Sequence, residues 1–122
     1  MATVLVINHD ASLVLLLETA LRRSGHTVIS TGDGESGLQV VAQHAPDVII
    51  LDARLPGLSS DEVVRWLRHN PATKSVPVIL CTTDHLLSGR SPAAYDAHLK
   101  LPARPNDITN MVNRLLIGRD SG

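Results

Sequence analysis

Residues 48–51 form a continuous apolar run, Val-Ile-Ile-Leu, which ends in Asp52 and is followed by a turn at residues 55–57, Leu-Pro-Gly. An apolar run of this length without polar alternation is typical of a strand buried on both faces, as in a parallel sheet covered by helices. Parallel strands need crossover connections, which are usually helices. This segment therefore predicts an α/β fold that displays Asp52 where its strand ends.

The rest of the chain repeats the same alternation of short β-branched runs and longer stretches with apolar residues at helical spacing. In the stretch before Pro46, for example, Leu38, Val41 and Ala42 predict the core face of a helix. We expect five strands, at residues 3–7, 26–30, 48–51, 76–81 and 98–101. Strict alternation predicts a doubly wound parallel sheet of the flavodoxin-like order 2-1-3-4-5, with a pocket above the first and third strands.

One connection departs from this regularity. Residues 88–92, Ser-Gly-Arg-Ser-Pro, interrupt the helix that should join the fourth and fifth strands. We therefore expect a shortened or irregular fourth helix. After the fifth strand, the sequence predicts a final amphipathic helix that carries Ile108 and Val112 on its core face.

The composition fits one compact domain, which we place at residues 1–118 with a tail at 119–122. A net charge of −1 without a basic block argues against nucleic acid and anionic lipid as partners. Strand-like sequence begins at Thr3, which leaves no room for a signal peptide, and no apolar run approaches membrane-spanning length. The single cysteine, Cys81, fits a reducing compartment. We therefore expect a cytoplasmic protein without a membrane segment.

Two segments resemble the receiver domains of bacterial response regulators, the CheY-like superfamily. Residues 46–52, Pro-Asp-Val-Ile-Ile-Leu-Asp, followed by the turn at 55–57, are similar to that family's third strand, and residues 78–82 are similar to its fourth. The resemblance covers the chain from Val4 to Leu116. It implies that Asp52 occupies the position that accepts a phosphoryl group from a sensor kinase, and that Thr82 is the hydroxyl residue that contacts this group.

The same resemblance implies an altered metal site. Two acidic residues normally follow the family's first strand and help to hold Mg²⁺, but this chain has Asn8 and His9 there. The remaining ligands are Asp52, Asn8 and the backbone carbonyl near Arg54, a poor set for a hard cation that prefers carboxylates. We expect weak Mg²⁺ binding, with His9 either favouring a softer metal such as Mn²⁺ or Zn²⁺ or lying on the surface.

The fifth strand departs from the family pattern as well. The family's lysine before the strand-end proline is replaced by Leu101, and Lys100 lies one residue early. Strand side chains alternate between faces, so Lys100 should point away from the pocket unless the backbone is bulged. The aromatic switch position of the family falls on His98, which either changes rotamer or is an ordinary strand-end residue.

Two functions follow from this pattern, and neither is that of an enzyme. The first is a single-domain receiver in two-component phosphorelay signalling, with a sensor histidine kinase or phosphotransfer protein upstream and a protein partner downstream. Its phosphorylation on Asp52 is expected to be slow or absent, because the charges that assist phosphoryl transfer are depleted. The second is a phosphorylation-independent pseudo-receiver that acts as a protein–protein interaction module.

Two further points remain open at the level of sequence. A flavin-binding flavodoxin relative would share the topology, but the sequence Asn8-His9-Asp10 and an aromatic content of 2% argue against it. Trp66, the only tryptophan, either packs partly buried or anchors a partner from an outer helix face.

Overall fold

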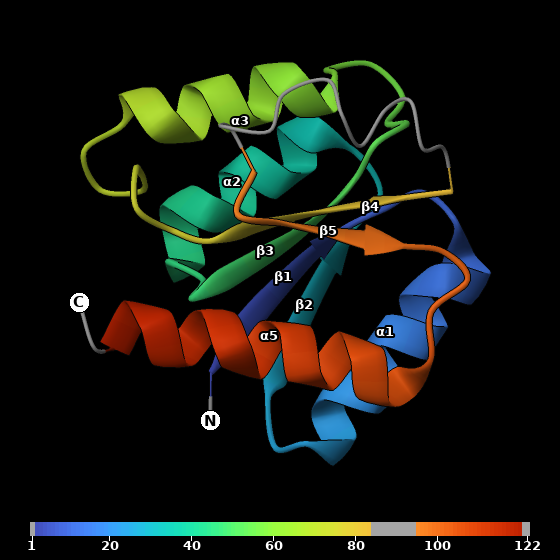
Figure 1. Ribbon diagram of the computed structural model, residues 1–122. Coiled ribbons are helices and arrows are strands. Elements are labelled where there is room, and N and C mark those ends of the chain that lie inside the picture. Colours follow the sequence, from blue (N-terminus) through green and yellow to red (C-terminus); the bar gives the residue numbers. More distant parts are fainter. Residues whose placement is uncertain (1, 84–94, 121–122) are drawn as a thin grey trace.

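The computed structural model describes residues 2–83 and 95–120, in which strands alternate with helices (Figure 1). The strands are β1 (Thr3–Ile7), β2 (Thr27–Thr31), β3 (Val48–Asp52), β4 (Val78–Thr82) and β5 (Ala97–Lys100). The helices are α1 (Ala11–Arg23), α2 (Gly34–His44), α3 (Ser60–His69) and α5 (Pro105–Asp120). Most of the segment in which we expected a short or irregular fourth helix, residues 84–94, lies outside the described residues.

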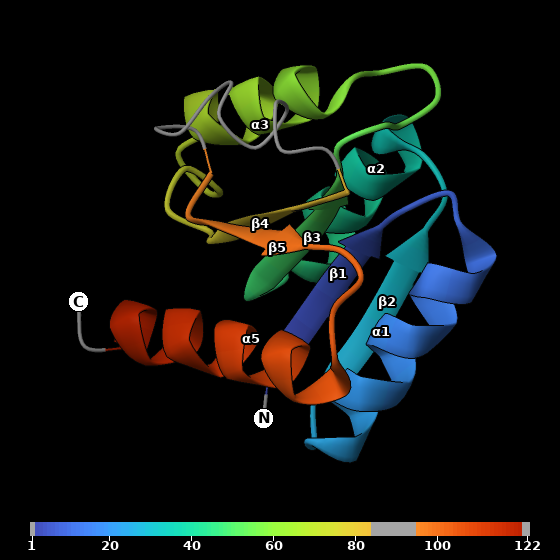
Figure 2. The same ribbon diagram turned by 45° about the vertical axis from the view of Figure 1, so that its right-hand side comes forward.

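The five strands form one sheet in the order β2-β1-β3-β4-β5, with every pairing parallel. This confirms the doubly wound α/β fold and the order 2-1-3-4-5. Helices α1 and α5 cover one face of the sheet, and α2 and α3 cover the other (Figures 1 and 2). Adjacent parallel strands end at the same edge, so the loops after β1 and β3 meet there.

Strands β1 to β4 contribute side chains to two apolar cores, one on each face of the sheet, and β5 contributes to one of them. In β1, Val4 and Val6 enter the core beneath α1 and α5, whereas Leu5 and Ile7 enter the core beneath α2 and α3. Residues 48–51 are at most 1% exposed, which confirms that this run is buried on both faces. Burial of each such side chain contributes about 1.5–3 kcal/mol, so the central strands β1, β3 and β4 contribute strongly to stability.

The helices begin at polar side chains that accept hydrogen bonds from free backbone N–H groups. Asp10 caps α1, Asp33 caps α2 and Ser59 caps α3. The Ser59 hydroxyl also contacts Glu62 in the first turn of α3. Such caps satisfy donors that have no partner within the helix, and each contributes about 1 kcal/mol.

Several strand boundaries differ by one or two residues from those expected. The fourth strand begins at Val78 rather than Val76, because the Val76 N–H donates to the Thr73 carbonyl in a turn. The fifth strand ends at Lys100, so Leu101 follows it instead of closing it. The second strand begins after His26.

His26 is buried, and its ring joins two distant segments of the chain. Its Nδ1 accepts from the Ala2 N–H at 3.2 Å, and its Nε2 lies 2.9 Å from Asn113 Oδ1 on α5. Since Nδ1 acts as an acceptor, Nε2 carries the ring hydrogen and donates to Asn113. The ring therefore ties the start of β1 to α5.

The core face of α2 was predicted wrongly in one respect. Ala42 is exposed, and the buried positions of the helix are Gly34, Gly37 and Val41. A Cβ atom on Gly37 would lie 2.4 Å from Cδ1 of Ile7 and 2.8 Å from its Cγ1. Glycine at this position therefore allows the helix backbone to lie directly on the β1 side chains.

The substitution Gly37→Ala tests this close approach. Ile7 is fully buried and would have to shift within the core to make room for the methyl group, so we expect the free energy of unfolding to fall by about 1–3 kcal/mol. This loss should appear although alanine is favoured over glycine within a helix by ~1 kcal/mol. Urea denaturation measures the change. Gly32→Ala is the matched control, because a Cβ there meets nothing within 4 Å and should alter stability by less than about 0.5 kcal/mol. Equal stability of the two variants would contradict the packing argument.

No helix within residues 2–83 and 95–120 has the length and apolar character needed to cross a membrane.

Candidate functional site

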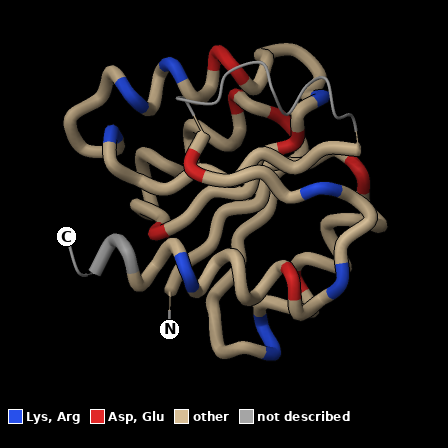
Figure 3. The backbone as a smooth tube through the Cα atoms, viewed as in Figure 1, with Lys and Arg blue, Asp and Glu red and all other residues tan. Residues whose placement is uncertain are grey.

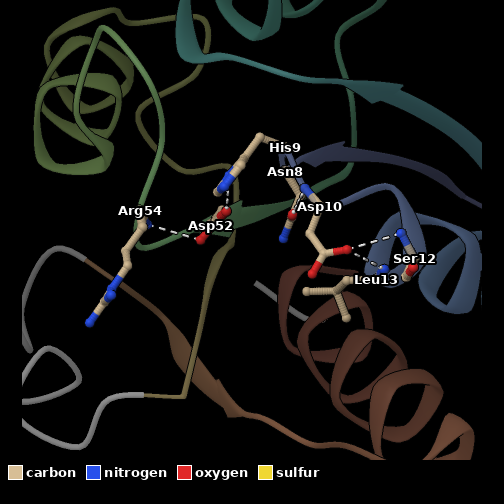
Figure 4. A network of polar contacts seen from close by, with 7 residues as sticks. All are labelled: Asn8, His9, Asp10, Ser12, Leu13, Asp52 and Arg54. Carbon is tan, nitrogen blue, oxygen red and sulfur yellow. Dashed lines mark hydrogen bonds and ion pairs between the residues drawn. The ribbon is translucent and has the colours of Figure 1, made fainter.

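The candidate site lies at the carboxyl edge of the sheet, above β1 and β3 (Figure 4). Asp52 is the last residue of β3, and Asn8 and His9 directly follow β1. The register pairs Ile7 with Leu51, which brings the residues after the two strands together. Of the predicted site residues, Asn8, His9, Asp52 and Arg54 therefore meet at one place.

Both oxygens of the Asp52 carboxylate have hydrogen-bonding partners. Oδ1 accepts from the Arg54 backbone N–H at 2.9 Å, and Oδ2 lies 2.9 Å from Nδ1 of His9. The Asp52 side chain is 14% exposed, whereas the His9 side chain is 53% exposed and covers it from the solvent side. An ionised carboxylate only accepts hydrogen bonds, so in that state Nδ1 of His9 carries the hydrogen. The contact is thus a direct histidine–aspartate pair (Figure 4).

Asn8 and Asp10 serve the start of α1 rather than Asp52. Asn8 is 3% exposed, and its Oδ1 accepts from the Asp10 N–H at 2.8 Å. Asp10 in turn accepts from the N–H groups of Ser12 and Leu13 through Oδ1. Figure 4 shows the Asp10 side chain directed toward α1 and away from Asp52. The loop after β1 therefore offers Asp52 an imidazole and no carboxylate.

Thr82 closes β4 beside this site. The register pairs Asp52 with Cys81, so Thr82 lies one residue beyond the pair, and it is 6% exposed. Its carbonyl accepts from the Leu101 N–H at 3.0 Å, which extends the contact between β4 and the end of β5. The hydroxyl residue is therefore buried at the edge of the sheet that carries Asp52.

The cationic side chain of β5 lies on the other face of the sheet from Asp52. Lys100 pairs with Thr82, whereas Leu99 pairs with Cys81 and thus shares the face of Asp52. Lys100 is exposed. Leu101 is half-buried and packs against the core beneath α1 and α5. The face of β5 that Asp52 shares therefore carries an aliphatic side chain. The lysine ammonium lies on the other face.

His98 lies further back along β5. Its Nε2 is buried and has no hydrogen-bond partner among the described residues, and its ring lies 5.9 Å from the ring of Tyr95 at a tilt of 58°. The Tyr95 hydroxyl donates to Asp61 Oδ1 on α3 at 2.7 Å. Tyr95 is thus fixed in place, and His98 packs beside it.

The available ligands fit a magnesium ion poorly. Within the described part of the chain, no three histidine, cysteine, aspartate or glutamate side chains are grouped to hold a metal ion. Among the described residues, only Asp52 offers a carboxylate to the site, because Asp10 caps α1, and His9 already contacts Oδ2 of Asp52. Mg²⁺ prefers carboxylate and other oxygen ligands in octahedral geometry, and an imidazole is a softer ligand.

The contact between His9 and Asp52 is the feature that sequence reasoning missed. His9 was considered as a metal ligand or a surface residue, and not as a partner of Asp52. The predicted order 2-1-3-4-5 contained the necessary signal, because it makes the first and third strands neighbours. A polar residue two positions after the first strand then lies within reach of the residue that ends the third.

The family model for the response regulator receiver domain matches residues 4–112. The chain belongs to this family. Members are signalling modules in two-component systems rather than enzymes, and they typically bind Mg²⁺ at the phosphoacceptor site.

Three known proteins show the extent of the similarity. Protein PilH of Pseudomonas aeruginosa is 28% identical over 97% of this chain and 100% of its own length. The structure of a putative response regulator from Chloroflexus aurantiacus is 27% identical, covers 95% of this chain and 98% of that chain, and has a TM-score of 0.89. The receiver domain of sensor histidine kinase PA1611 from Pseudomonas aeruginosa is 23% identical, covers 94% of this chain and 97% of that chain, and has a TM-score of 0.87. In that structure a magnesium ion is coordinated in the active site cleft.

Other relatives are longer than this receiver domain. The chain spans 35% of the regulator AfsQ1 of Streptomyces coelicolor and 52% of the DNA-binding regulator MtrA of Mycolicibacterium paratuberculosis.

Cys81, beside Asp52 in the register, provides a test of burial at the site. Burial and, to a smaller extent, the negative charge of Asp52 together raise the pKa of its thiol to about 12. The thiolate is the reactive form, so we expect no labelling by iodoacetamide at pH 8 in the folded receiver domain and full labelling in urea. Asp52→Asn removes the smaller cause and should leave Cys81 unreactive. Rapid labelling of the folded protein would contradict the placement of this thiol in the core.

Proposed function

We propose that this chain acts as a single-domain receiver in which phosphorylation of Asp52 is slow or absent. The observation that carries the proposal is the His9–Asp52 contact of 2.9 Å, at the position where the family resemblance implies an acidic metal ligand. The upstream partner is a sensor histidine kinase or phosphotransfer protein, and the downstream partner is another protein in the cytoplasm. The match to PilH over its whole length supports a role that needs no attached output domain.

Phosphoryl transfer to Asp52 would form a bond between a carboxylate oxygen and phosphorus while the bond from phosphorus to the donor breaks. The electron pair of that bond leaves with the donor, which takes up a proton. Catalysis of such a transfer depends on positive charge and donors that stabilise the transferring oxygens. Here Oδ1 is held by the Arg54 N–H and Oδ2 by His9, so both candidate nucleophilic oxygens are engaged before a donor arrives.

Two sources of positive charge that would assist the transfer, a bound Mg²⁺ and a lysine side chain, lack their usual residues at this site. Asn8 and His9 replace carboxylates that would hold Mg²⁺, and Leu101 replaces a lysine that would face the phosphoryl group. Lys100 does not compensate, because it is exposed on the opposite face of β5. The retained helpers are Thr82 and backbone N–H groups.

The second candidate function is a pseudo-receiver that binds its partner without phosphorylation. The same histidine–aspartate pair favours it, because His9 satisfies Oδ2 of Asp52 in the absence of metal and phosphoryl group. In this case the pair would hold the loops after β1 and β3 in one arrangement.

A phosphodonor assay separates the two functions. The protein is incubated with acetyl phosphate and Mg²⁺ or Mn²⁺, and intact mass is recorded over time, with Asp52→Ala as the negative control. We expect an Asp52-dependent adduct to form slowly or not at all, because the stabilising charges are depleted. A complete absence of adduct with either metal would favour the pseudo-receiver. Rapid formation of the adduct would refute the proposal of an impaired site.

Restoring the family residues should reverse the defect. The variant that combines Asn8→Asp, His9→Asp and Leu101→Lys provides carboxylates for Mg²⁺ and a cation for the phosphoryl group. We expect calorimetric titration to show Mg²⁺ binding at least about 10-fold tighter than in the natural sequence, and phosphorylation faster by a similar factor. His44→Asp, at an exposed position on α2, controls for the change in net charge. Tight Mg²⁺ binding by the natural sequence that is lost in Asp52→Ala would contradict the weak-site part of the proposal.

A further inference from the structure

The pair formed by His9 and Asp52 contains a second nucleophile besides the carboxylate. The ring of His9 donates through Nδ1 to Oδ2 of Asp52 at 2.9 Å, as an ionised carboxylate requires. In this neutral tautomer Nε2 carries a lone pair in place of a hydrogen. Among the described residues, Nε2 of His9 has no hydrogen-bond partner. The second ring nitrogen is therefore a nucleophile that no contact occupies.

The carboxylate oxygens are less available than this nitrogen. Oδ1 of Asp52 accepts from the Arg54 N–H at 2.9 Å, and Oδ2 is held by His9. The Asp52 side chain is 14% exposed, whereas the His9 side chain is 53% exposed. Figure 4 shows the imidazole reaching from the loop after β1 to the carboxylate. A phosphodonor that approaches from solvent therefore meets the ring before it meets the carboxylate.

His9 also borders an open hollow of about 580 Å³ between the start of α1 and the end of β2. Its lining also includes Asn8, Ala11, Leu15, Thr31 and Gly32. Glu18, an acidic residue of this lining, has partners of its own, because it pairs with Arg22 at 3.0 Å and accepts from the Ser30 hydroxyl at 2.9 Å. The hollow therefore gives a small phosphodonor access to the ring of His9.

A carboxylate on Nδ1 is the arrangement that prepares an imidazole to react through Nε2. It fixes the tautomer, orients the ring and makes the free nitrogen more basic. It also stabilises the positive charge that develops on the ring when Nε2 forms a bond. Histidine is one of the side chains that form covalent intermediates in this way. The contact at 2.9 Å gives His9 all of these features, with Asp52 as the carboxylate.

We propose that His9 is a phosphoacceptor of this chain, modified at Nε2, and that Asp52 is the positioning residue for it. This assignment rests on the proposed function as a receiver of phosphoryl groups, and it moves the receiving atom from an oxygen of Asp52 to a nitrogen of His9. The upstream donor then belongs to the same chemical class, a phosphorylated histidine of a kinase or phosphotransfer protein.

The transfer balances without a metal ion or a redox partner. The lone pair of Nε2 forms a bond to phosphorus while the bond from phosphorus to the donor nitrogen breaks, and the electron pair of that bond leaves with the donor. With phosphoramidate as donor, the leaving group is ammonia, because its nitrogen already carries three protons. The ring keeps its Nδ1 hydrogen and becomes positively charged, and this charge lies against the carboxylate of Asp52.

The test uses potassium phosphoramidate in the presence of EDTA, with modified residues located by mass spectrometry of peptides over time. His69 is an internal control, because it is exposed and its Nδ1 lies 2.7 Å from the Arg65 carbonyl. It therefore has the same tautomer as His9 but a neutral acceptor in place of a carboxylate. We expect His9 to be modified at least about 10-fold faster than His69.

The chemistry of the adduct identifies the atom that carries it. A phosphoryl group on a ring nitrogen survives alkali, whereas an acyl phosphate on Asp52 is hydrolysed. In ³¹P–¹H correlation spectra, phosphorus on Nε2 couples to both ring C–H protons, and phosphorus on Nδ1 couples to that between the nitrogens alone. We expect an alkali-stable adduct with the Nε2 pattern.

Two variants separate the roles of the pair. His9→Asn keeps an N–H donor for Asp52 and removes the nucleophile, so the alkali-stable adduct in this loop should disappear. Asp52→Asn removes the negative charge beside Nδ1 and should slow modification of His9 at least about 10-fold. Modification of His69 should be unchanged in both variants, and a folded ¹⁵N–¹H spectrum shows that the receiver domain is intact.

Three results would overturn the assignment. The first is modification of His9 and His69 at equal rates. The second is a rate at His9 that is unchanged in folded Asp52→Asn. The third is the absence of an alkali-stable adduct on His9. An alkali-labile adduct on Asp52 bears on the proposed function alone, so failure of one proposal is distinguishable from failure of the other.

Discussion

The pairing of β1 with β3 is the interaction on which the rest of this receiver domain depends. Val4 pairs with Val48 and Ile7 with Leu51, so two strands whose paired residues are all buried run side by side through the middle of the sheet. Each strand fills both cores, and both groups of helices therefore pack on the same pair. The pairing also fixes which loops meet at the edge, and it places His9 and Asp52 on neighbouring loops.

The contact between His9 and Asp52 changes the chemistry of this edge without changing the fold. The main-chain hydrogen bond from Arg54 to Asp52 depends on the turn after β3 and would form whatever residue follows β1. The side chain at position 9 then decides what the second carboxylate oxygen meets. Because this side chain is half exposed, it can vary at little cost in stability. The site can therefore change its chemistry while the sheet beneath it stays the same.

The strand order could be predicted from the sequence because the period of the apolar residues reports burial directly. The continuous run at residues 48–51 has one structural explanation, and the structure confirms it. The buried face of α2 was harder to predict, because Gly37 has no side chain and therefore does not contribute to a hydrophobic pattern. Gly37 is buried because Ile7 of β1 lies directly against it, and this contact belongs to the tertiary structure rather than to the local sequence. Ala42 fits a helical period equally well and is nevertheless exposed.

The candidate site could likewise be predicted only in part from the sequence. Its location followed from the strand order, and the positions of Asp52 and Thr82 followed from the ends of the apolar runs. The hydrogen-bond partner of each side chain could not be predicted from the sequence. Rotamers and loop geometry decide whether His9 reaches Asp52 and whether Asn8 turns toward α1. The end of β5 was misplaced by one residue for a related reason. Leu101 has the apolar character of a strand residue, and only the ladder of hydrogen bonds shows where the strand ends.

Helix α3 is attached to the edge of the sheet at two points. Tyr95 donates to Asp61 near the start of the helix, and Asp96 binds Arg68 near its end. The two attachments are two helical turns apart on one side of α3, and they come from consecutive residues before β5. Trp66 lies between them along the helix axis and about 140° around it from Asp61. The indole is therefore carried on a helix that is held at two points, so its exposed face keeps a fixed orientation relative to the sheet.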